Sequence, residues 1–311
     1  KNVCQRKPRI EGKDLTYVPH GIDENVYHPV DDLDGELVKV REQLFRGEDV
    51  DFVLLFNSRN IQRKRCADLI QAYRMFCDTL PKEKSSKCAL VFHSTPVDEH
   101  GTDLPAVAEA ICSDYRVVFS DGKVSSEALK LIYNIADVTC QPSSAEGFGL
   151  SVMESIMCGT PVLVNCVGGL QDQIGLIKED GSPVTLEDYK GDWPSNSNGR
   201  YKSYGNWAYA TWPQMNLVGS PLTPYIYDSR TSISQIRDGI AYWYQYSRDD
   251  RKQMGLTGRA WAINNGFTKE SMCEEMSKSI DGILKDFEPR KRFTIINSNR
   301  EKIKYPDGVI I

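Results

Sequence analysis

The sequence predicts an α/β fold built on a doubly wound, Rossmann-like parallel sheet, and two observations carry this prediction. Short apolar runs rich in β-branched residues recur along the first half of the chain and read as nearly continuous, which is typical of strands buried on both faces. Segments with helical spacing of apolar residues separate these runs, as in βαβ units. The five predicted strands are 51–56, 88–93, 115–120, 136–142 and 160–166.

The predicted helices follow from local spacing and capping signals. Residues 65–80 and 125–135 carry apolar residues at helical intervals, and the second segment begins with a serine cap at Ser125 followed by Glu127. A third helix, "GLSVMESIMC", is predicted to end at Gly159, directly before the last strand. In sheets of this kind ligands bind at the carboxyl ends of the strands, so the loops that follow the strands are the first place to look for function.

Composition and charge narrow the functional classes. The 311-residue chain is 40% hydrophobic with a net charge of −5, which gives no overall electrostatic reason to bind nucleic acid or an acidic membrane. No apolar run approaches the roughly 20 residues that span a bilayer. The nine cysteines form no C-x-x-C pair, which favours reduced thiols and a cytoplasmic location over a disulfide framework. Because the sequence begins at Lys1 without a signal-peptide pattern, we expect a fragment or a processed product.

The stretch "SSAEGFGLSVMESIMCGTPVLVNCVGG" (143–169) combines glycines with two glutamates. Its start lies between a strand and a helix N-terminus, where backbone N–H groups and the helix dipole favour an anion. Glu146 lies in this loop and Glu154 lies eight residues on, inside the predicted helix. Taken alone, two such glutamates are more often solvated or capping groups. Within a phosphate-binding cleft, a carboxylate is favourable when it accepts hydrogen bonds from hydroxyl groups, which a sugar or a ribose supplies.

Four ordered segments of the chain resemble one enzyme family. Residues 146–172 are similar to the E-x7-E signature of retaining glycosyltransferases of the GT-B fold, family four (glycosyl transferases group 1). Residues 56–73 resemble that family's glycine/arginine loop, 16–29 resemble the segment that enters its second domain, and 128–150 match in order and spacing. The resemblance continues more weakly to about residue 285. It implies the C-terminal, donor-binding domain of a GT-B enzyme.

The resemblance implies a role for each matching residue. Arg59 and Lys64 would clamp the diphosphate of the donor, although a solvated basic cluster would look similar in sequence. Glu146 would lie beside the transferred sugar, and Glu154 would bind the ribose hydroxyls. The nucleobase would lie against residues 119–129. The backbone N–H groups that would face the sugar and the phosphates belong to Gly147, Phe148, Gly149 and Leu150.

The implied reaction transfers a sugar from a UDP-, GDP- or ADP-linked donor to the hydroxyl of an unknown acceptor, with retention of anomeric configuration. No DxD-type motif lies beside the clamp, so we expect no metal and no cofactor. Ser58, Arg65 and Asp172 depart from the family pattern, and Arg65 adds a charge that could reach an acidic acceptor. Two alternatives stay open: a non-catalytic module that binds nucleotide sugars, and another GT-B chemistry such as a nucleotide-sugar epimerase.

Changes in composition divide the chain. We assign an entry segment (1–30), a nucleotide-sugar-binding domain (31–180), an aromatic-rich insertion (181–227), C-terminal helices (228–287) and a tail (288–311). An amino-terminal acceptor-binding domain is absent from this sequence, so we expect it to be supplied in cis or in trans. The aromatic side chains of the insertion could stack on an acceptor or form a lid, but we favour a small separate core of Trp193, Trp207 and Trp212. The three predicted C-terminal helices, 232–247, 248–265 and 268–287, are expected to pack against the sheet.

Overall fold

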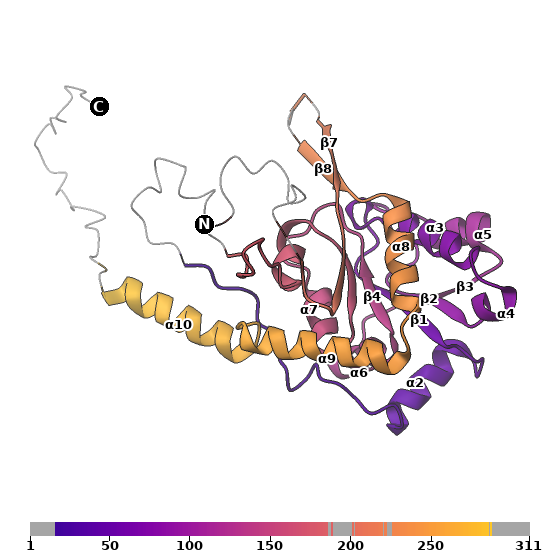
Figure 1. Ribbon diagram of the computed structural model, residues 1–311, viewed down its shortest axis with the longest axis horizontal. Coiled ribbons are helices and arrows are strands. Elements are labelled where there is room, and N and C mark those ends of the chain that lie inside the picture. Colours follow the sequence, from indigo (N-terminus) through magenta and orange to yellow (C-terminus); the bar gives the residue numbers. More distant parts are fainter. Residues whose placement is uncertain are drawn as a thin grey trace, which may run out of the picture.

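A six-stranded parallel sheet forms the centre of the computed structural model, which describes residues 16–185, 188, 201, 203–219, 221–222, 226–285 and 287 (Figure 1). The strands are β1 (Phe52–Asn57), β2 (Cys88–His93), β3 (Arg116–Ser120), β4 (Val138–Gln141), β5 (Val162–Asn165) and β6 (Ala208–Thr211). Their order is β3-β2-β1-β4-β5-β6, which is that of the Rossmann fold. The predicted doubly wound sheet is therefore confirmed. The winding direction reverses between β1 and β4, so their carboxyl ends form the switch point where such sheets bind ligands.

Helices cover both faces of the sheet and enclose two apolar layers. Alternate residues of β1 serve the two layers, with Val53 and Leu55 on one side and Phe52, Leu54 and Phe56 on the other, as the two-residue period of a strand requires. The first layer packs against α2 (Gly35–Phe45), α6 (Ser126–Ile135), α7 (Leu150–Met157) and α9 (Arg248–Asn264). The second packs against α3 (Cys66–Cys77), α5 (Leu104–Cys112) and α8 (Ile233–Tyr244), and the short α4 (Lys82–Ser85) precedes β2.

The aromatic-rich segment contributes to the main sheet, which corrects the predicted separate core. Strand β6 pairs in parallel with β5, and Trp207, directly before it, is buried in the main apolar core. Trp212 stacks on Tyr201 at the edge of the same core, and Trp193 lies outside the described residues. The prediction failed because a four-residue strand after a long polar stretch gives only a short apolar run in the sequence.

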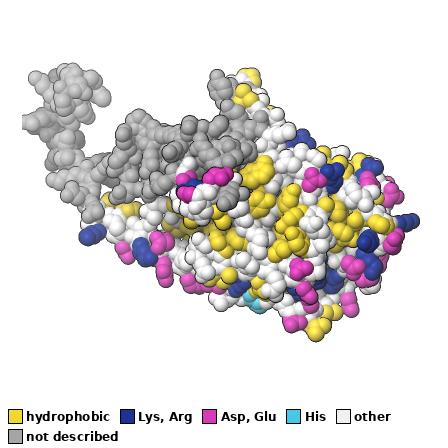
Figure 2. All heavy atoms as spheres, in the orientation of Figure 1, with side chains coloured by type: hydrophobic (Ala, Val, Ile, Leu, Met, Phe, Trp, Pro, Cys, Tyr) yellow, Lys and Arg dark blue, Asp and Glu magenta, His cyan; other side chains and the backbone are white. Residues whose placement is uncertain are grey.

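A β-hairpin follows β6 and projects from the body of the domain. Its strands are β7 (Gln214–Val218) and β8 (Ile226–Arg230), paired antiparallel. Apolar side chains gather at its outer end, at the top of the view in Figure 2, where Leu217 is 57% exposed and Leu222 is 94% exposed. At its base the hairpin returns to the sheet, because Asn165 Nδ2 donates hydrogen bonds to the carbonyl oxygens of Ser143 (2.9 Å) and Ser229 (2.7 Å).

The last helix, α10 (Lys269–Lys285), extends away from the sheet (Figure 1). None of its residues is buried, and Ile283 and Leu284 are each 62% exposed. The prediction that all three C-terminal helices pack against the sheet is therefore wrong for α10 and correct for α8 and α9. Within the described part of the chain, no helix is both long and apolar enough to cross a bilayer. The eight cysteines of that part are free thiols, and all but Cys273 are buried.

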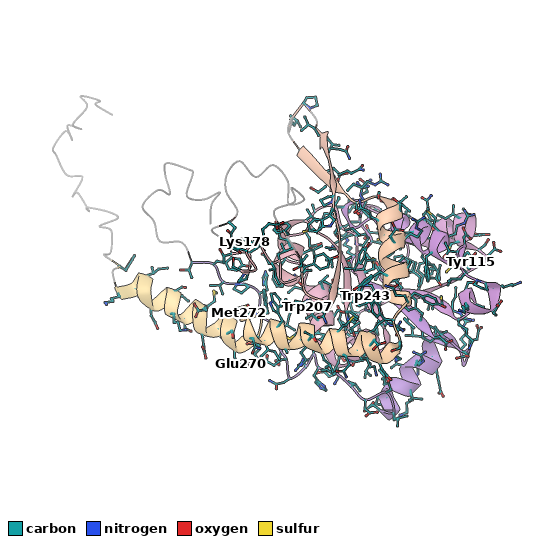
Figure 3. The ribbon with its side chains drawn as sticks, in the orientation of Figure 1. Tyr115, Lys178, Trp207, Trp243, Glu270 and Met272 are labelled. Carbon is teal, nitrogen blue, oxygen red and sulfur yellow. The ribbon has the colours of Figure 1, made fainter. Side chains whose placement is uncertain are left out.

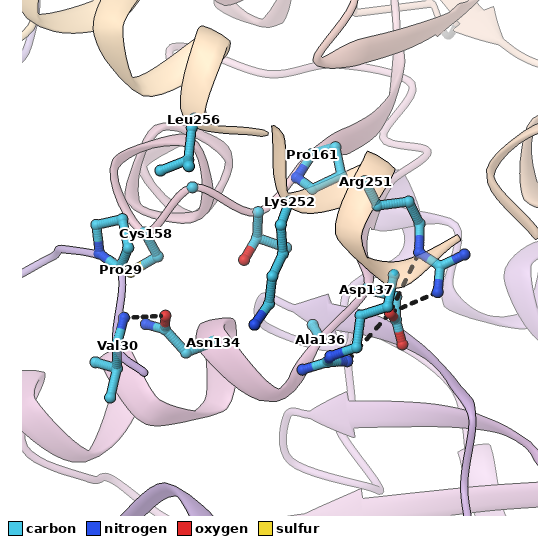
Figure 4. A pocket seen from close by; sticks show the side chains of 13 residues that line it. Pro29, Val30, Asn134, Ala136, Asp137, Cys158, Pro161, Arg251, Lys252 and Leu256 are labelled. Carbon is cyan, nitrogen blue, oxygen red and sulfur yellow. Dashed lines mark hydrogen bonds and ion pairs between the residues drawn. The ribbon is translucent and has the colours of Figure 1, made fainter. Parts of the chain in front are cut away.

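A buried ion cluster closes the amino end of the sheet (Figure 4). Asp137, which lies directly before β4 and is 3% exposed, accepts hydrogen bonds from the backbone N–H of Val53 (2.7 Å) and from Nη2 of Arg251 (2.8 Å). Arg248 adds a bond of 3.1 Å to the same carboxylate. Arg251 is itself 5% exposed and also donates to the carbonyl oxygen of Trp243 (3.2 Å). These bonds tie β1 and β4 to the start of α9.

Candidate active site

The candidate site lies at the switch point, where the loops after β1 and β4 meet. The first loop leads into a short 3-10 helix, η2 (Gln62–Lys64), and the second loop (142–149) leads into α7. The backbone N–H of Ser144 donates to the carbonyl oxygen of Arg63 (2.8 Å), which holds the two loops together. Both loops therefore lie at the carboxyl ends of their strands, where the sequence placed them.

The Gly-Gly pair of the sequence explains the shape of the second loop. A third segment, η3 (Gly168–Gln173), packs directly against this loop. A Cβ at Gly168 would lie 1.9 Å from the carbonyl oxygen of Glu146, and a Cβ at Gly169 would lie 2.4 Å from that of Gly147. Any side chain here would push the loop outward, so both glycines are required for the close approach of the two backbones.

Lys64 and Glu146 form a buried ion pair at the centre of the site. Nζ of Lys64 lies 2.5 Å from Oε2 of Glu146, and the two side chains are 8% and 10% exposed. Nη1 of Arg63 reaches the same carboxylate oxygen at 3.2 Å and donates to the carbonyl oxygen of Ala145 at 2.6 Å. The resemblance implies catalytic roles for Glu146, Arg59 and Lys64, and the structure brings the first and the third together.

The electrostatics of this pair favour binding of an anion. Burial raises the pKa of Glu146, but the hydrogen bonds and charges of Lys64 and Arg63 outweigh it and hold the pKa below the usual value. Burial also lowers the pKa of Lys64, and the Glu146 carboxylate offsets only part of this effect. The cations of Lys64 and Arg63 face the single carboxylate of Glu146 in a partly buried environment. The cluster therefore carries one net positive charge, which favours an anionic ligand.

Arg59 lies apart from this cluster. Its Nε bonds to Oδ2 of Asp98 at 2.9 Å, and its side chain is 61% exposed. The amide of Asn60 fixes the backbone beside it by donating to the carbonyl oxygens of Thr102 (2.6 Å) and Pro96 (3.1 Å). Arg63, for which no separate role was predicted, is the arginine that contacts Glu146. Arg65 pairs with Asp228 of the hairpin at 2.5 Å, so its charge is used within the chain.

Glu154 lies inside α7 and faces α6. Its Oε2 accepts a hydrogen bond from the hydroxyl of Tyr133 (2.7 Å), and that hydroxyl accepts one from Nδ2 of Asn57 (2.6 Å). Burial raises the pKa of Glu154, while hydrogen bonds from Tyr133 and Tyr27 oppose the rise. Tyr133 and Asn57 were not among the predicted site residues. The available signal was a tyrosine on a core-facing stripe, because a buried tyrosine hydroxyl needs a polar partner.

The start of α7 presents backbone groups to the site. Gly149 precedes the helix with φ of 93°, and no side chain of the described residues caps it. The carbonyl oxygens of Phe148 and Gly149 accept hydrogen bonds from Nε2 of Gln173, at 2.6 and 3.3 Å, which fixes the turn. Leu150, the first residue of the helix, is 48% exposed. The predicted N–H groups of residues 147–150 thus belong to an uncapped helix start, where the helix dipole attracts anions.

In the stretches of chain that the structure describes, no three His, Cys, Asp or Glu side chains gather in the way that metal ligands do.

Comparison with known sequences finds similarity to glycosyltransferases. Residues 41–182, which include both loops of the site, match the family model described as Glycosyl transferases group 1. The D-inositol 3-phosphate glycosyltransferase of Acidothermus cellulolyticus is 32% identical over 179 residues, which cover 56% of this chain and 37% of that protein. The chain thus spans little more than a third of the length of this curated relative.

Comparison with solved structures identifies the fold. HepE from Anabaena, solved with UDP and glucose, superposes with a TM-score of 0.59 at 15% identity and covers 86% of this chain and 56% of its own. The C-terminal domain of LpcC, a glycosyl transferase group 1 family protein of Francisella tularensis, superposes with a TM-score of 0.50 at 15% identity over 78% of this chain and 97% of that domain. This is the GT-B glycosyltransferase fold. In this GT-B domain, the switch point carries Lys64 and Glu146.

Proposed function

We propose that this chain is the donor-binding part of a glycosyltransferase that moves a sugar from a nucleotide-diphosphate sugar to an acceptor hydroxyl, with retention of anomeric configuration and without a metal. The observation that carries the proposal is the buried Lys64–Glu146 pair beside the uncapped start of α7. A cation and helix N–H groups suit a diphosphate, and the adjacent carboxylate suits the hydroxyl groups of a sugar. The match of residues 41–182 to the glycosyltransferase model supports the same function.

Each residue then has a separate task. The diphosphate binds to Lys64 and to the N–H groups of residues 147–150, and the sugar hydroxyls donate to Glu146. Arg59 joins the diphosphate by leaving Asp98, because an exposed ion pair of this kind costs little to break. Glu154, oriented by Tyr133, accepts the ribose hydroxyls.

The reaction follows from the charges. The bond between the anomeric carbon and the phosphate oxygen breaks, and its electron pair stays on the departing nucleotide diphosphate, where Lys64 stabilises the new charge. The acceptor oxygen bonds to the anomeric carbon from the same face and transfers its proton to the departing phosphate. The Glu146 carboxylate stabilises positive charge at the anomeric carbon as the bonds exchange. An acceptor-binding domain, in cis or in trans, supplies the second substrate, and the free thiols fit a cytoplasmic location.

Calorimetric titration with UDP, GDP and ADP, in EDTA and in Mg²⁺, tests the proposal. We expect one nucleotide to bind equally in both buffers, and Glu154→Gln to weaken binding roughly 10- to 100-fold through loss of charged hydrogen bonds. Glu109→Gln, an exposed change on α5, serves as the matched control and should leave binding unchanged. Binding of no nucleotide, or a strict need for metal, would contradict the proposal.

Product analysis separates the open alternatives. Transfer to an acceptor by the chain together with its acceptor-binding domain, with retained configuration by NMR, supports the glycosyltransferase. Release of an epimerised free sugar would instead indicate the epimerase, and nucleotide binding without turnover would indicate a binding module.

A further inference from the structure

A second cavity, of about 420 Å³, lies beside η3 and is separate from the Lys64–Glu146 site. Its walls include Tyr17, Asp172, Leu176, Val184, Trp207 and Trp261. The volume falls within the range of roughly 300–1,000 Å³ that is typical of small-molecule pockets. None of the residues proposed above to hold the donor lines this cavity.

The apolar wall of the cavity is fixed in place. The rings of Trp207 and Trp261 lie 5.0 Å apart between centroids, and Nε1 of Trp207 donates to the carbonyl oxygen of Gln173 (3.2 Å). Figure 3 shows Trp207 beside α9, where a Cβ at Gly258 would lie 2.4 Å from its ring. With Leu176 and Val184, these side chains form a preformed apolar surface.

Two polar side chains of the cavity wall, Asp172 and Gln171, offer oxygen atoms that can accept hydrogen bonds. Oδ2 of Asp172 accepts one hydrogen bond, from the Tyr17 hydroxyl at 3.2 Å. The Gln171 Oε1 atom is buried and has no hydrogen-bond partner among the described residues. The lining residues that the structure describes include no lysine or arginine. Burial raises the pKa of Asp172 to about 6, so this carboxyl is ionised at pH 8.

We infer that this cavity is a binding site for a neutral amphiphile, that is, an apolar body carrying at least one hydroxyl group. The apolar body packs against the indole rings, and the hydroxyl donates to Asp172 or Gln171. Anionic ligands are disfavoured because a carboxylate faces the cavity without a cation. This site goes beyond the proposed sugar transfer and does not depend on it.

Hydrogen bonds also link the cavity to the loop 142–149, which precedes α7. Gln173 accepts from Trp207 through its backbone and donates from its side chain to the carbonyl oxygen of Phe148 (2.6 Å). A ligand that shifts Trp207 therefore acts on the turn that begins α7.

Quenching of tryptophan fluorescence by two matched probes tests the inference at pH 8. The probe 6-bromohexan-1-ol is neutral, 6-bromohexanoate is its anionic counterpart, and bromine quenches an indole that it contacts. We expect saturable quenching with an affinity at least tenfold higher for the alcohol. Val184→Phe, which fills the cavity, should abolish saturation, whereas Val218→Phe on the exposed hairpin should not.

A second variant keeps the inference testable if the filling substitution disturbs folding. Asp172→Asn should narrow the difference between the two probes at least threefold, because the repulsive charge is gone. Three results would overturn the inference. They are quenching that rises linearly with probe concentration in the wild type, equal affinities for the two probes, and quenching in Val184→Phe that equals that of the wild type. Since no nucleotide is present, failure here leaves the proposed transfer untouched, and failure of nucleotide binding leaves this site untouched.

Discussion

Two buried ion clusters lie at opposite ends of the same sheet, and they differ in how fully they are bonded. At the amino end, Asp137 accepts bonds from Arg248, Arg251 and the backbone of Val53. At the carboxyl end, the bonds to Glu146 from Lys64 and Arg63 both go to one carboxylate oxygen. A buried charge is tolerated when its bonding capacity is filled. We infer that the first cluster is structural and that the second retains capacity for a ligand.

The largest expected effect is a loss of folding stability when the charge of Asp137 is removed. Asp137→Asn leaves Arg251 buried without its counter-charge, so the free energy of unfolding should fall by about 3–5 kcal/mol. Urea denaturation followed by circular dichroism measures this change. Asp32→Asn, at the exposed edge of the same cluster, is the control and should cost less than about 1 kcal/mol. Equal losses in the two variants would show that the burial of Asp137 is unimportant.

The next prediction concerns the cluster at the carboxyl end of the sheet and is measured as a change in kcat. Under the proposed transfer, assayed together with an acceptor-binding domain, Lys64→Met should lower kcat by roughly 100- to 1,000-fold, because the departing phosphate loses its cation. Its effect on unfolding should be smaller than that of Asp137→Asn, since Arg63 still faces Glu146. Lys39→Met, on the exposed surface of α2, is the control. A stability loss as large as that at Asp137, with normal kcat, would make both clusters structural.

A smaller effect on nucleotide affinity is expected from Tyr133, which donates a hydrogen bond to Glu154. Tyr133→Phe removes a hydrogen bond to Glu154, so nucleotide affinity should fall by about fivefold, the equivalent of about 1 kcal/mol. Because the ionised carboxyl loses a donor, the pKa of Glu154 should rise further. Affinity in the variant should therefore begin to fall at a higher pH than in the wild type as the solution is acidified. Calorimetric titration at a series of pH values measures both effects, and Tyr209→Phe is the control. If nucleotide affinity in Tyr133→Phe and in the wild type begins to fall at the same pH, Tyr133 does not position Glu154.

The last prediction concerns the pH dependence of stability at Asp172. Burial raises its pKa from 3.8 to about 6, so the native state binds more protons than the unfolded state between these values. The contribution of Asp172 to stability is therefore present below pH 4 and is lost as pH rises through 6. Asp172→Asn should gain stability relative to the wild type across this interval and keep a constant difference above it. Thermal unfolding at pH 4, 5, 6 and 7 measures the difference, and a constant value throughout would contradict the assignment.

Local patterns predicted the fold but not every partner in the site. Buried parallel strands and their helices leave short-range signatures, so five of the six strands of the main sheet were predicted, while β6 gave too short an apolar run. The proximity of Lys64 and Glu146 could be expected from the sequence, because their loops follow two neighbouring strands at the same edge of the sheet. Which arginine turns inward could not be predicted, because it depends on the η2 turn, where Arg65 adopts φ of 59°. The Asn57–Tyr133–Glu154 chain and the partners of Asp137 arise from tertiary packing that no local pattern encodes.

The hairpin after β6 has a consequence for the order of folding. Arg65 pairs with Asp228, 163 residues later in the chain, and Arg230 pairs with Asp68, 162 residues earlier. Contacts between such distant residues carry a large loop-closure cost, so they form after local structure in most domains. During synthesis, the loop that holds Lys64 emerges long before the hairpin that flanks it. We therefore expect the rim of the candidate site to be the last part of the domain to become ordered.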